Sequence, residues 1–146
     1  YMPKNKLLKL KEAHDYILNN YSNPELSIKV LADISRISEG HFRRLFKTIY
    51  GCPPVEYINN LRINHAKELL LCSELSVTDI VYAVGFSDVS YFSKIFKASG
   101  LLSPNSYRKT FKNREYLLKC LLRSEHMYIH LLVTFQILLN QKMYPI

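Results

Sequence analysis

The sequence has little cysteine, and its cysteines form no pair. Cys52, Cys72 and Cys120 are widely separated, and no two of them stand in a Cys-x-x-Cys pattern. A disulfide framework or a zinc finger needs such pairs, so their absence argues against both and favours a reducing cytoplasm. We interpret the three side chains as buried thiols that act as small apolar residues.

Targeting and membrane segments are also missing. We find no signal peptide, and the longest apolar run, 131–139, contains Thr134 and Gln136. This run is far shorter than the roughly 20 residues that a membrane-spanning helix needs. The sequence therefore predicts no membrane partner.

The motifs of catalysis are absent as well. The five histidines form no His-Glu-x-x-His pattern, and neither a Gly-rich phosphate loop nor a nucleophile motif occurs. His126 and His130 are four positions apart and could share a metal ion, but no third ligand is evident. We predict that the protein is not an enzyme and holds neither a metal nor another cofactor.

Glycine is scarce, and so is alternation of polar with apolar residues. The chain has four glycines in 146 residues, and no stretch keeps a period of two. Its composition, 48% hydrophobic and 22% charged, is that of a globular protein. The sequence predicts an all-α protein with one domain, or one compact domain and a tail.

What the sequence does have is positive charge, and this charge is unevenly placed. The formal net charge is +8; residues 1–114 carry 17 Lys/Arg against 10 Asp/Glu, and residues 115–146 carry 3 against 2. A basic domain favours an acidic partner such as nucleic acid or an anionic surface.

The chain is organised around the segment 84–97. Gly85 stands where a helix would end with a positive φ, and Ser87 is a candidate N-cap for the next helix. At about 100° per residue, one side of that helix is apolar and the opposite side is polar. The apolar side holds Val89, Phe92, Ile95 and Phe96, and the polar side holds Ser90, Ser93, Lys94 and Lys97.

The same pattern occurs about 49 positions earlier. The segment 26–32 aligns with 75–81, and past one inserted residue Phe42 and Phe46 align with Phe92 and Phe96. The earlier helix has Phe42, Leu45 and Phe46 on its apolar side and Gly40, Arg43, Arg44 and Lys47 on the other. The unit that fits is the helix-turn-helix, used twice.

The rest of the chain predicts about seven helices in all. A first helix covers 6–20, helix-turn-helix 1 covers about 26–50, a connector helix about 55–71, and helix-turn-helix 2 about 75–99. We expect one inner stripe on the connector: Ile58, Leu61, His65 or Ala66, and Leu69. Ser27, Ser38, Ser76 and Ser103 are expected to be N-caps. Residues 115–146 form a C-terminal extension of unknown role, which we expect to be helical.

These residues resemble the DNA-binding domain of the AraC/XylS-type bacterial transcription regulators. The resemblance covers about 6–112. It rests most strongly on Ile80, Gly85-Phe86, Asp88, Ser90-Tyr91-Phe92-Ser93, Phe96-Lys97, Ser103-Pro104 and Tyr107-Arg108. Between the repeats, Pro54, Glu56-Tyr57-Ile58, Arg62-Ile63 and Ala66-Lys67-Glu68-Leu69-Leu70 match too. The chain departs from the pattern at three positions: Arg36 in place of a turn glycine, Gly40 in place of a side chain that often faces DNA, and Leu101 in place of a glycine.

The polar stripes predict the contacts to DNA. Arg43, Arg44, Ser90, Ser93 and Lys94 are the candidates for base edges, because a guanidinium can bond guanine O6 and N7 together. The family's base contacts fall on the same stripes. Lys47 and Lys97, one turn further along, are candidates for phosphate contacts, as are the helix starts at Ser27 and Ser76.

The function implied is sequence-specific binding of double-stranded DNA and regulation of transcription, in the cytoplasm and at the nucleoid. One monomer could read two adjacent major grooves. The resemblance also implies RNA polymerase as a partner, and a separate N-terminal sensing or dimerisation domain for which this chain has no room, so we expect a fragment of a larger regulator. Two alternatives stay open: a helical protein-interaction module, and a domain that binds nucleic acid nonspecifically.

Overall fold

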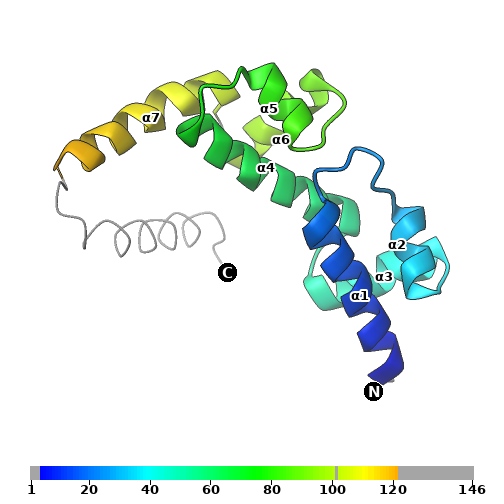
Figure 1. The fold of residues 1–146 in the computed structure, drawn as a ribbon. Helices are drawn as coiled ribbons and strands as arrows, with labels where there is room; N and C mark the ends of the chain where they lie inside the picture. Colours follow the sequence, from blue (N-terminus) through cyan, green and yellow to red (C-terminus); the bar gives the residue numbers. More distant parts are fainter. Residues whose placement is uncertain (1–3, 101, 122–146) are drawn as a thin grey trace. The chain divides into compact units, whose positions relative to one another are not determined.

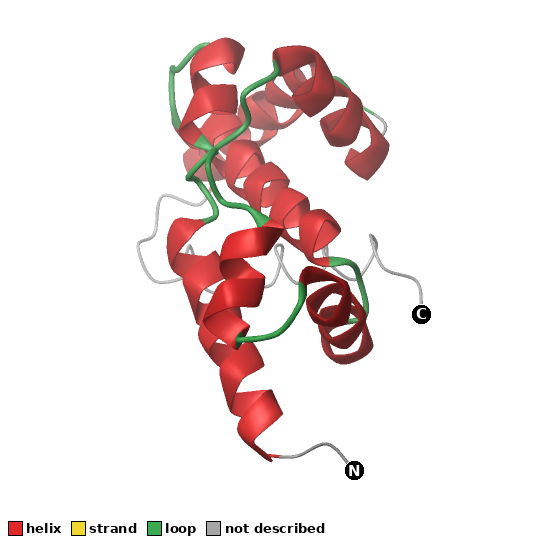
Figure 2. Ribbon diagram, turned by 90° about the vertical axis from the view of Figure 1, so that its right-hand side faces the viewer, coloured by secondary structure: helices red, strands yellow, loops and turns green. Residues whose placement is uncertain are grey.

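The structure is a computed structural model that describes the backbone of residues 4–100 and 102–121, and the side chains of 8–100 and 102–112. Over these residues the chain consists of helices and loops without a strand, as Figure 2 shows. The predicted all-α class is confirmed. None of the described helices combines the length and the hydrophobicity needed to cross a membrane.

Seven helices follow one another along the described part of the chain (Figure 1). They are α1 (Lys4–Asn20), α2 (Ile28–Ser35), α3 (Glu39–Tyr50), α4 (Pro54–Cys72), α5 (Val77–Ala83), α6 (Val89–Gly100) and α7 (Pro104–Leu121). The two predicted helix-turn-helix segments correspond to α2–α3 and α5–α6, and the predicted connector corresponds to α4.

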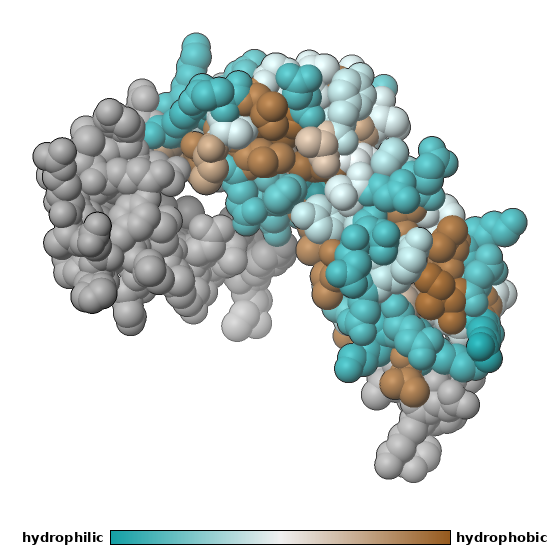
Figure 3. Space-filling view, in the orientation of Figure 1, coloured by the Kyte–Doolittle hydropathy of each residue, from teal (hydrophilic) through white to brown (hydrophobic). Residues whose placement is uncertain are grey.

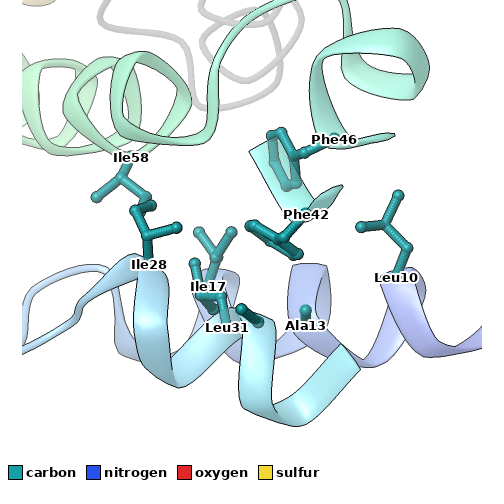
Figure 4. Packing of buried hydrophobic residues seen from close by; sticks show 9 residues of the cluster. Leu10, Ala13, Ile17, Ile28, Leu31, Phe42, Phe46 and Ile58 are labelled. Atoms are coloured by element: carbon teal, nitrogen blue, oxygen red, sulfur yellow. The ribbon is translucent and has the colours of Figure 1, made fainter. Parts of the chain in front are cut away.

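The first hydrophobic core lies between α1, α2, α3 and the start of α4 (Figure 4). Phe42 and Phe46 of α3 are fully buried in it, with ring centroids 5.6 Å apart. Burying a side chain of this size contributes about 1.5–3 kcal/mol. This pair therefore decides which face of α3 points outward. The remaining members come from α1, α2 and α4: Leu10, Ala13, Ile17, Ile28, Leu31, Ala32 and Ile58.

The second core repeats this arrangement with α4, α5 and α6. Phe92 and Phe96 of α6 are buried as their counterparts in α3 are, with ring centroids 5.5 Å apart. A spacing of 53 positions relates three core residues of α1 to three of α4: Leu10, Ala13 and Ile17 to Ile63, Ala66 and Leu70. We call α1–α3 together with residues 54–61 of α4 the first subdomain, and residues 62–72 of α4 together with α5 and α6 the second subdomain, because Leu61 packs on the first core and Ile63 belongs to the second.

A tyrosine from the following helix closes each core. Tyr57 packs edge-on against Phe46 and Tyr107 edge-on against Phe96, with centroids 5.5 Å apart in both pairs. Each tyrosine comes three residues after the proline that begins its helix. The internal repeat therefore extends past the helix-turn-helix motifs into the first turns of α4 and α7.

The structure corrects the predicted inner stripe of the connector. Leu61 and Leu69 are only partly buried, and Ile63 and Leu70 are buried in their place. The stripe shifts because the start of α4 packs on the first core and the rest of α4 packs on the second. A single stripe at helical spacing cannot serve both cores.

The turns of the two motifs share a left-handed residue after the first helix. Arg36 has φ 53° and ψ 45°, and Gly85 has φ 95°. The expected positive φ at Gly85 is confirmed. Arg36 also has a positive φ, a conformation that is mildly unfavourable for a residue with a Cβ. Gly85 has a second reason to be glycine, because a Cβ there would lie 2.7 Å from the backbone oxygen of Ser22.

Serine hydroxyls cap four helices as predicted. Oγ of each accepts the N–H of the residue three positions on: Ser27 at α2, Ser38 at α3, Ser76 at α5 and Ser103 at α7. The predicted cap at Ser87 is wrong, because α6 begins at Val89 and the Asp88 carboxylate accepts the N–H of Tyr91. From the left-handed residue to the cap, the second turn (85–88) is one residue longer than the first (36–38), and this extra residue displaces Ser87 from the cap.

Helix α7 continues across the predicted boundary between residues 114 and 115. The chain divides into two compact units after Arg108, and the second is described here only as far as Leu121. The expectations for Leu101, for the Cys120 side chain and for 122–146 lie outside the described residues.

The two positive-φ glycines predict different costs for the same substitution. Gly51→Ala, where a Cβ would meet nothing within 4 Å, should destabilise the fold by about 1 kcal/mol from backbone strain alone. Gly85→Ala adds a clash with the Ser22 backbone and should cost about 3 kcal/mol or more. Urea unfolding of both variants measures the difference, and equal losses would contradict the close approach.

The revised cap of α6 predicts a second contrast. Asp88→Ala should lower the free energy of unfolding by about 1 kcal/mol, because the first turn loses its side-chain acceptor. Ser87→Ala should change it by less than about 0.5 kcal/mol. Thermal unfolding of the two variants checks the assignment, and a larger loss for Ser87→Ala would restore the original prediction.

Candidate nucleic-acid interface

The outward face of α3 carries the strongest cluster of predicted DNA-binding residues. Arg43, Arg44 and Lys47 are all exposed, while Phe42 and Phe46 of the same helix are buried. The positions follow from the 3.6-residue period, because the two phenylalanines fix the opposite face. The structure thus brings these three cations together on one surface. In the view of Figure 3, hydrophilic side chains cover most of the part of the molecule that holds α1–α3, with smaller apolar patches between them.

Two local features shape this surface. A terminal nitrogen of Arg43 lies 3.6 Å from a carboxylate oxygen of Glu39, and the two side chains are 50% and 48% exposed. Such an exposed pair contributes less than about 1 kcal/mol, so it holds Arg43 only weakly before a stronger acceptor arrives. Gly40 leaves open space beside Arg44, whose Nη1 is the nearest atom to an ideal Cβ at 3.8 Å.

The outward face of α6 is weaker in donors. Ser90, Lys94 and Lys97 are exposed and Ser93 is partly buried, so the structure brings all four to one side of the helix. Only two of the four carry charge. The opposite side holds Phe92 and Phe96, as in α3. Lys67 of α4 lies behind this helix, 5.9 Å from the centre of the Phe96 ring, and burial lowers the pKa of its amine.

The helix starts at Ser27 and Ser76 differ in charge. Ser27 caps α2, whose first turn has no acidic residue. The Ser76 hydroxyl donates to the Asp79 carboxylate at 2.6 Å, which places negative charge in the first turn of α5. Because an anion at a helix start is favoured by free N–H groups and disfavoured by a nearby carboxylate, the start of α2 offers an anion the more favourable electrostatics of the two.

The cysteines and histidines offer no alternative site in the part of the chain that the structure describes. No three His, Cys, Asp or Glu side chains within it are grouped so as to hold a metal ion. Cys72 is exposed, which corrects its interpretation as a buried thiol, and Cys52 is partly buried. Burial, and then the Glu56 carboxylate, raises the pKa of the Cys52 thiol, which makes it a poor nucleophile.

Two polar side chains that the sequence-based reasoning did not assign lie between the subdomains. Asn59 and Arg62 of α4 are both 9% exposed. Two signals were available: both residues lie between apolar residues of the connector, and Arg62 matches the family pattern. Neither signal reveals which groups the two side chains bond. Neither side chain lies on the outward faces of α3 and α6.

Comparison with known proteins supplies independent evidence. A family model described as a helix-turn-helix domain matches residues 31–110. The lactose operon transcription activator of Staphylococcus xylosus is 33% identical over 102 residues, which are 70% of this chain and 36% of that protein. The chain thus spans about a third to a half of the length of the curated relatives that it matches.

Two solved structures are similar over most of their own length. The C-terminal domain of the two-component response regulator yesN from Fusobacterium nucleatum is 33% identical, with a TM-score of 0.63. The match covers 66% of this chain and 93% of that one. A transcriptional regulator from Chromobacterium violaceum, described by its AraC-type DNA-binding domain, is 32% identical with a TM-score of 0.61, over 70% of this chain and 91% of that one.

Proposed function

Because the chain belongs to the AraC/XylS-type helix-turn-helix DNA-binding domains, we propose that it binds double-stranded DNA of a particular sequence and regulates transcription. The observation that carries the proposal is the repeated recognition helix with an apolar back and a polar, basic front. This family is one of DNA-binding domains and not of enzymes, and we propose no catalytic activity for this part.

The roles of the side chains follow from their chemistry. Arg43 and Arg44 suit the O6 and N7 acceptors of guanine in the major groove. Ser90, Ser93 and Lys94 form the second, weaker reading surface. Lys47, Lys97, Ser27 and Ser76 are proposed phosphate contacts, which position the protein without reading sequence.

We propose that one monomer reads two adjacent major grooves. Successive major grooves on one face of B-DNA are about 34 Å apart. Helix α4 has 19 residues, which at 1.5 Å each gives about 28 Å. With a subdomain at each end, a connector of this length suits two grooves of an asymmetric site.

Further partners are proposed on the resemblance alone. They are RNA polymerase near a promoter and a separate sensing or dimerisation domain, in the cytoplasm and at the nucleoid. There are two rival functions: a helical protein-interaction module and a domain that binds polyanions nonspecifically. Discrimination between DNA sequences separates the proposed function from both. Each wrong base pair should cost a specific reader about 1–3 kcal/mol.

Selection of bound duplexes from a random pool tests sequence reading. We expect a motif with two half-elements one helical turn apart. Arg43→Ala should relax one half-element and Lys94→Ala the other, because each removes a donor from a different recognition helix. The readout is the information content of each half-element in the selected sequences. Binding without any enriched motif would mean a nonspecific polyanion binder, and no binding would favour the interaction module.

The salt dependence of binding tests the phosphate contacts. Lys47→Ala should weaken all sequences alike and reduce the slope of log K against log salt by about 0.9, the loss of one neutralised phosphate. Lys11→Ala removes the same charge from the exposed side of α1 and should leave the slope unchanged. Equal slopes for the Lys47 and Lys11 variants would remove Lys47 from the interface.

A further inference from the structure

The two hydrophobic cores meet at a polar boundary inside α4. Ile58 belongs to the first core and Ile63 to the second. Asn59 and Arg62 lie between these two isoleucines in the sequence, and both side chains are buried. A buried polar group is costly unless its hydrogen bonds are made, so the partners of these two side chains are informative.

Arg62 contacts both subdomains. Its Nε donates to the backbone oxygen of Tyr21 at 2.6 Å, and its Nη2 donates to that of Asn23 at 2.9 Å. Both carbonyls belong to the loop between α1 and α2 of the first subdomain. The guanidinium carbon lies 5.5 Å from the ring centre of Phe86, in the turn of the second subdomain.

Two further contacts cross the same boundary. Asn59 Nδ2 donates to the hydroxyl of Tyr91, a residue of α6, at 3.1 Å. Gly85 lies so close to the Ser22 backbone that a Cβ would be 2.7 Å from its oxygen. We call this set of residues the subdomain joint: Tyr21, Ser22, Asn23, Asn59, Arg62, Gly85, Phe86 and Tyr91.

The joint constrains orientation in a way that the cores do not. Apolar contacts are not directional, and a helix that joins two bodies can bend. Charge-assisted hydrogen bonds are directional, and tilting the loop away would leave a buried cation without acceptors. One relative arrangement of the subdomains is therefore favoured over its neighbours.

A second arginine provides a comparison within one subdomain. Arg108 donates from Nε to the oxygen of Leu70 at 3.2 Å and from Nη2 to that of Leu75 at 2.6 Å. Its chemistry matches that of Arg62, but both acceptors belong to the second subdomain. Arg108 therefore serves as a control for the loss of an arginine bonded to two carbonyls.

We propose that the subdomain joint holds the recognition helices α3 and α6 at one separation and angle, and so sets the spacing between the two DNA half-elements that the chain accepts. The second clause rests on the DNA binding proposed above. Arg62 acts here as a positioning residue that does not itself touch DNA.

The first test measures the distance between the helices in the free, full-length chain. Spin labels at Thr48→Cys and Ala98→Cys occupy exposed, equivalent positions of α3 and α6, with Cys52, Cys72 and Cys120 replaced by serine. Pulsed electron paramagnetic resonance should give a narrow distance distribution. Arg62→Met and the milder Tyr91→Phe should broaden it, and Arg108→Met should not, with circular dichroism confirming that each variant is helical. Equal widths in all variants would overturn the joint.

The second test measures affinity for duplexes whose selected half-elements are moved by 1, 2 or 5 base pairs. Wild type should prefer the selected spacing. Arg62→Met should reduce that preference by roughly tenfold, leave the base preference within each half-element unchanged, and act more strongly than Arg62→Lys, which keeps a cation. Unchanged spacing preference in Arg62→Met and Tyr91→Phe would refute the role in spacing. If wild type selects no sequence, the proposed function fails, whereas the distance measurement still decides whether the joint holds the subdomains.

Discussion

The packing of α4 on two cores is the constraint on which both recognition helices depend. Its first two turns close the core behind α3 with Tyr57 and Ile58, and its remaining turns form a wall of the core behind α6. Because the phenylalanine pairs of α3 and α6 are buried in these cores, the outward faces of both helices are oriented relative to α4. A change in the middle of α4 therefore reaches both faces at once.

The sequence predicted the fold where the signal was local or repeated. Helical periodicity gave the elements, and small polar residues before apolar stripes gave four of the five predicted N-caps. The fifth failed because the two halves of the repeat can be aligned at an offset of 49 or of 50 positions. The first alignment places Ser87 opposite Ser38, and the second places Asp88 there. Local preference does not choose between Ser87 and Asp88, since both residue types make good caps.

The interior of α4 was harder to predict for a different reason. A single amphipathic stripe is the usual expectation for a helix on one core, and α4 packs on two. Arg62 resembles a surface residue by type, and its acceptors are backbone carbonyls of Tyr21 and Asn23, which no residue pattern reveals. The outward faces of α3 and α6 were predictable because they follow directly from the buried phenylalanines, whereas the charge beside Ser76 depends on a rotamer of Asp79.

The two proposed reading surfaces differ in the number of strong hydrogen-bond donors, and this difference makes the subdomain joint important for binding. The first has two arginines, a lysine and a helix start without an acidic first turn, whereas the second has two serines, two lysines and Asp79 at its helix start. A weak second surface adds little to the affinity for DNA if its subdomain moves freely, because binding must then fix the position of that subdomain, which costs entropy. If the second subdomain is held in a fixed position, its effective concentration at a groove with the matching spacing is high, and little entropy is lost on binding. The contribution of the second subdomain to specificity then depends on how firmly Arg62 and Tyr91 hold it in register with the first.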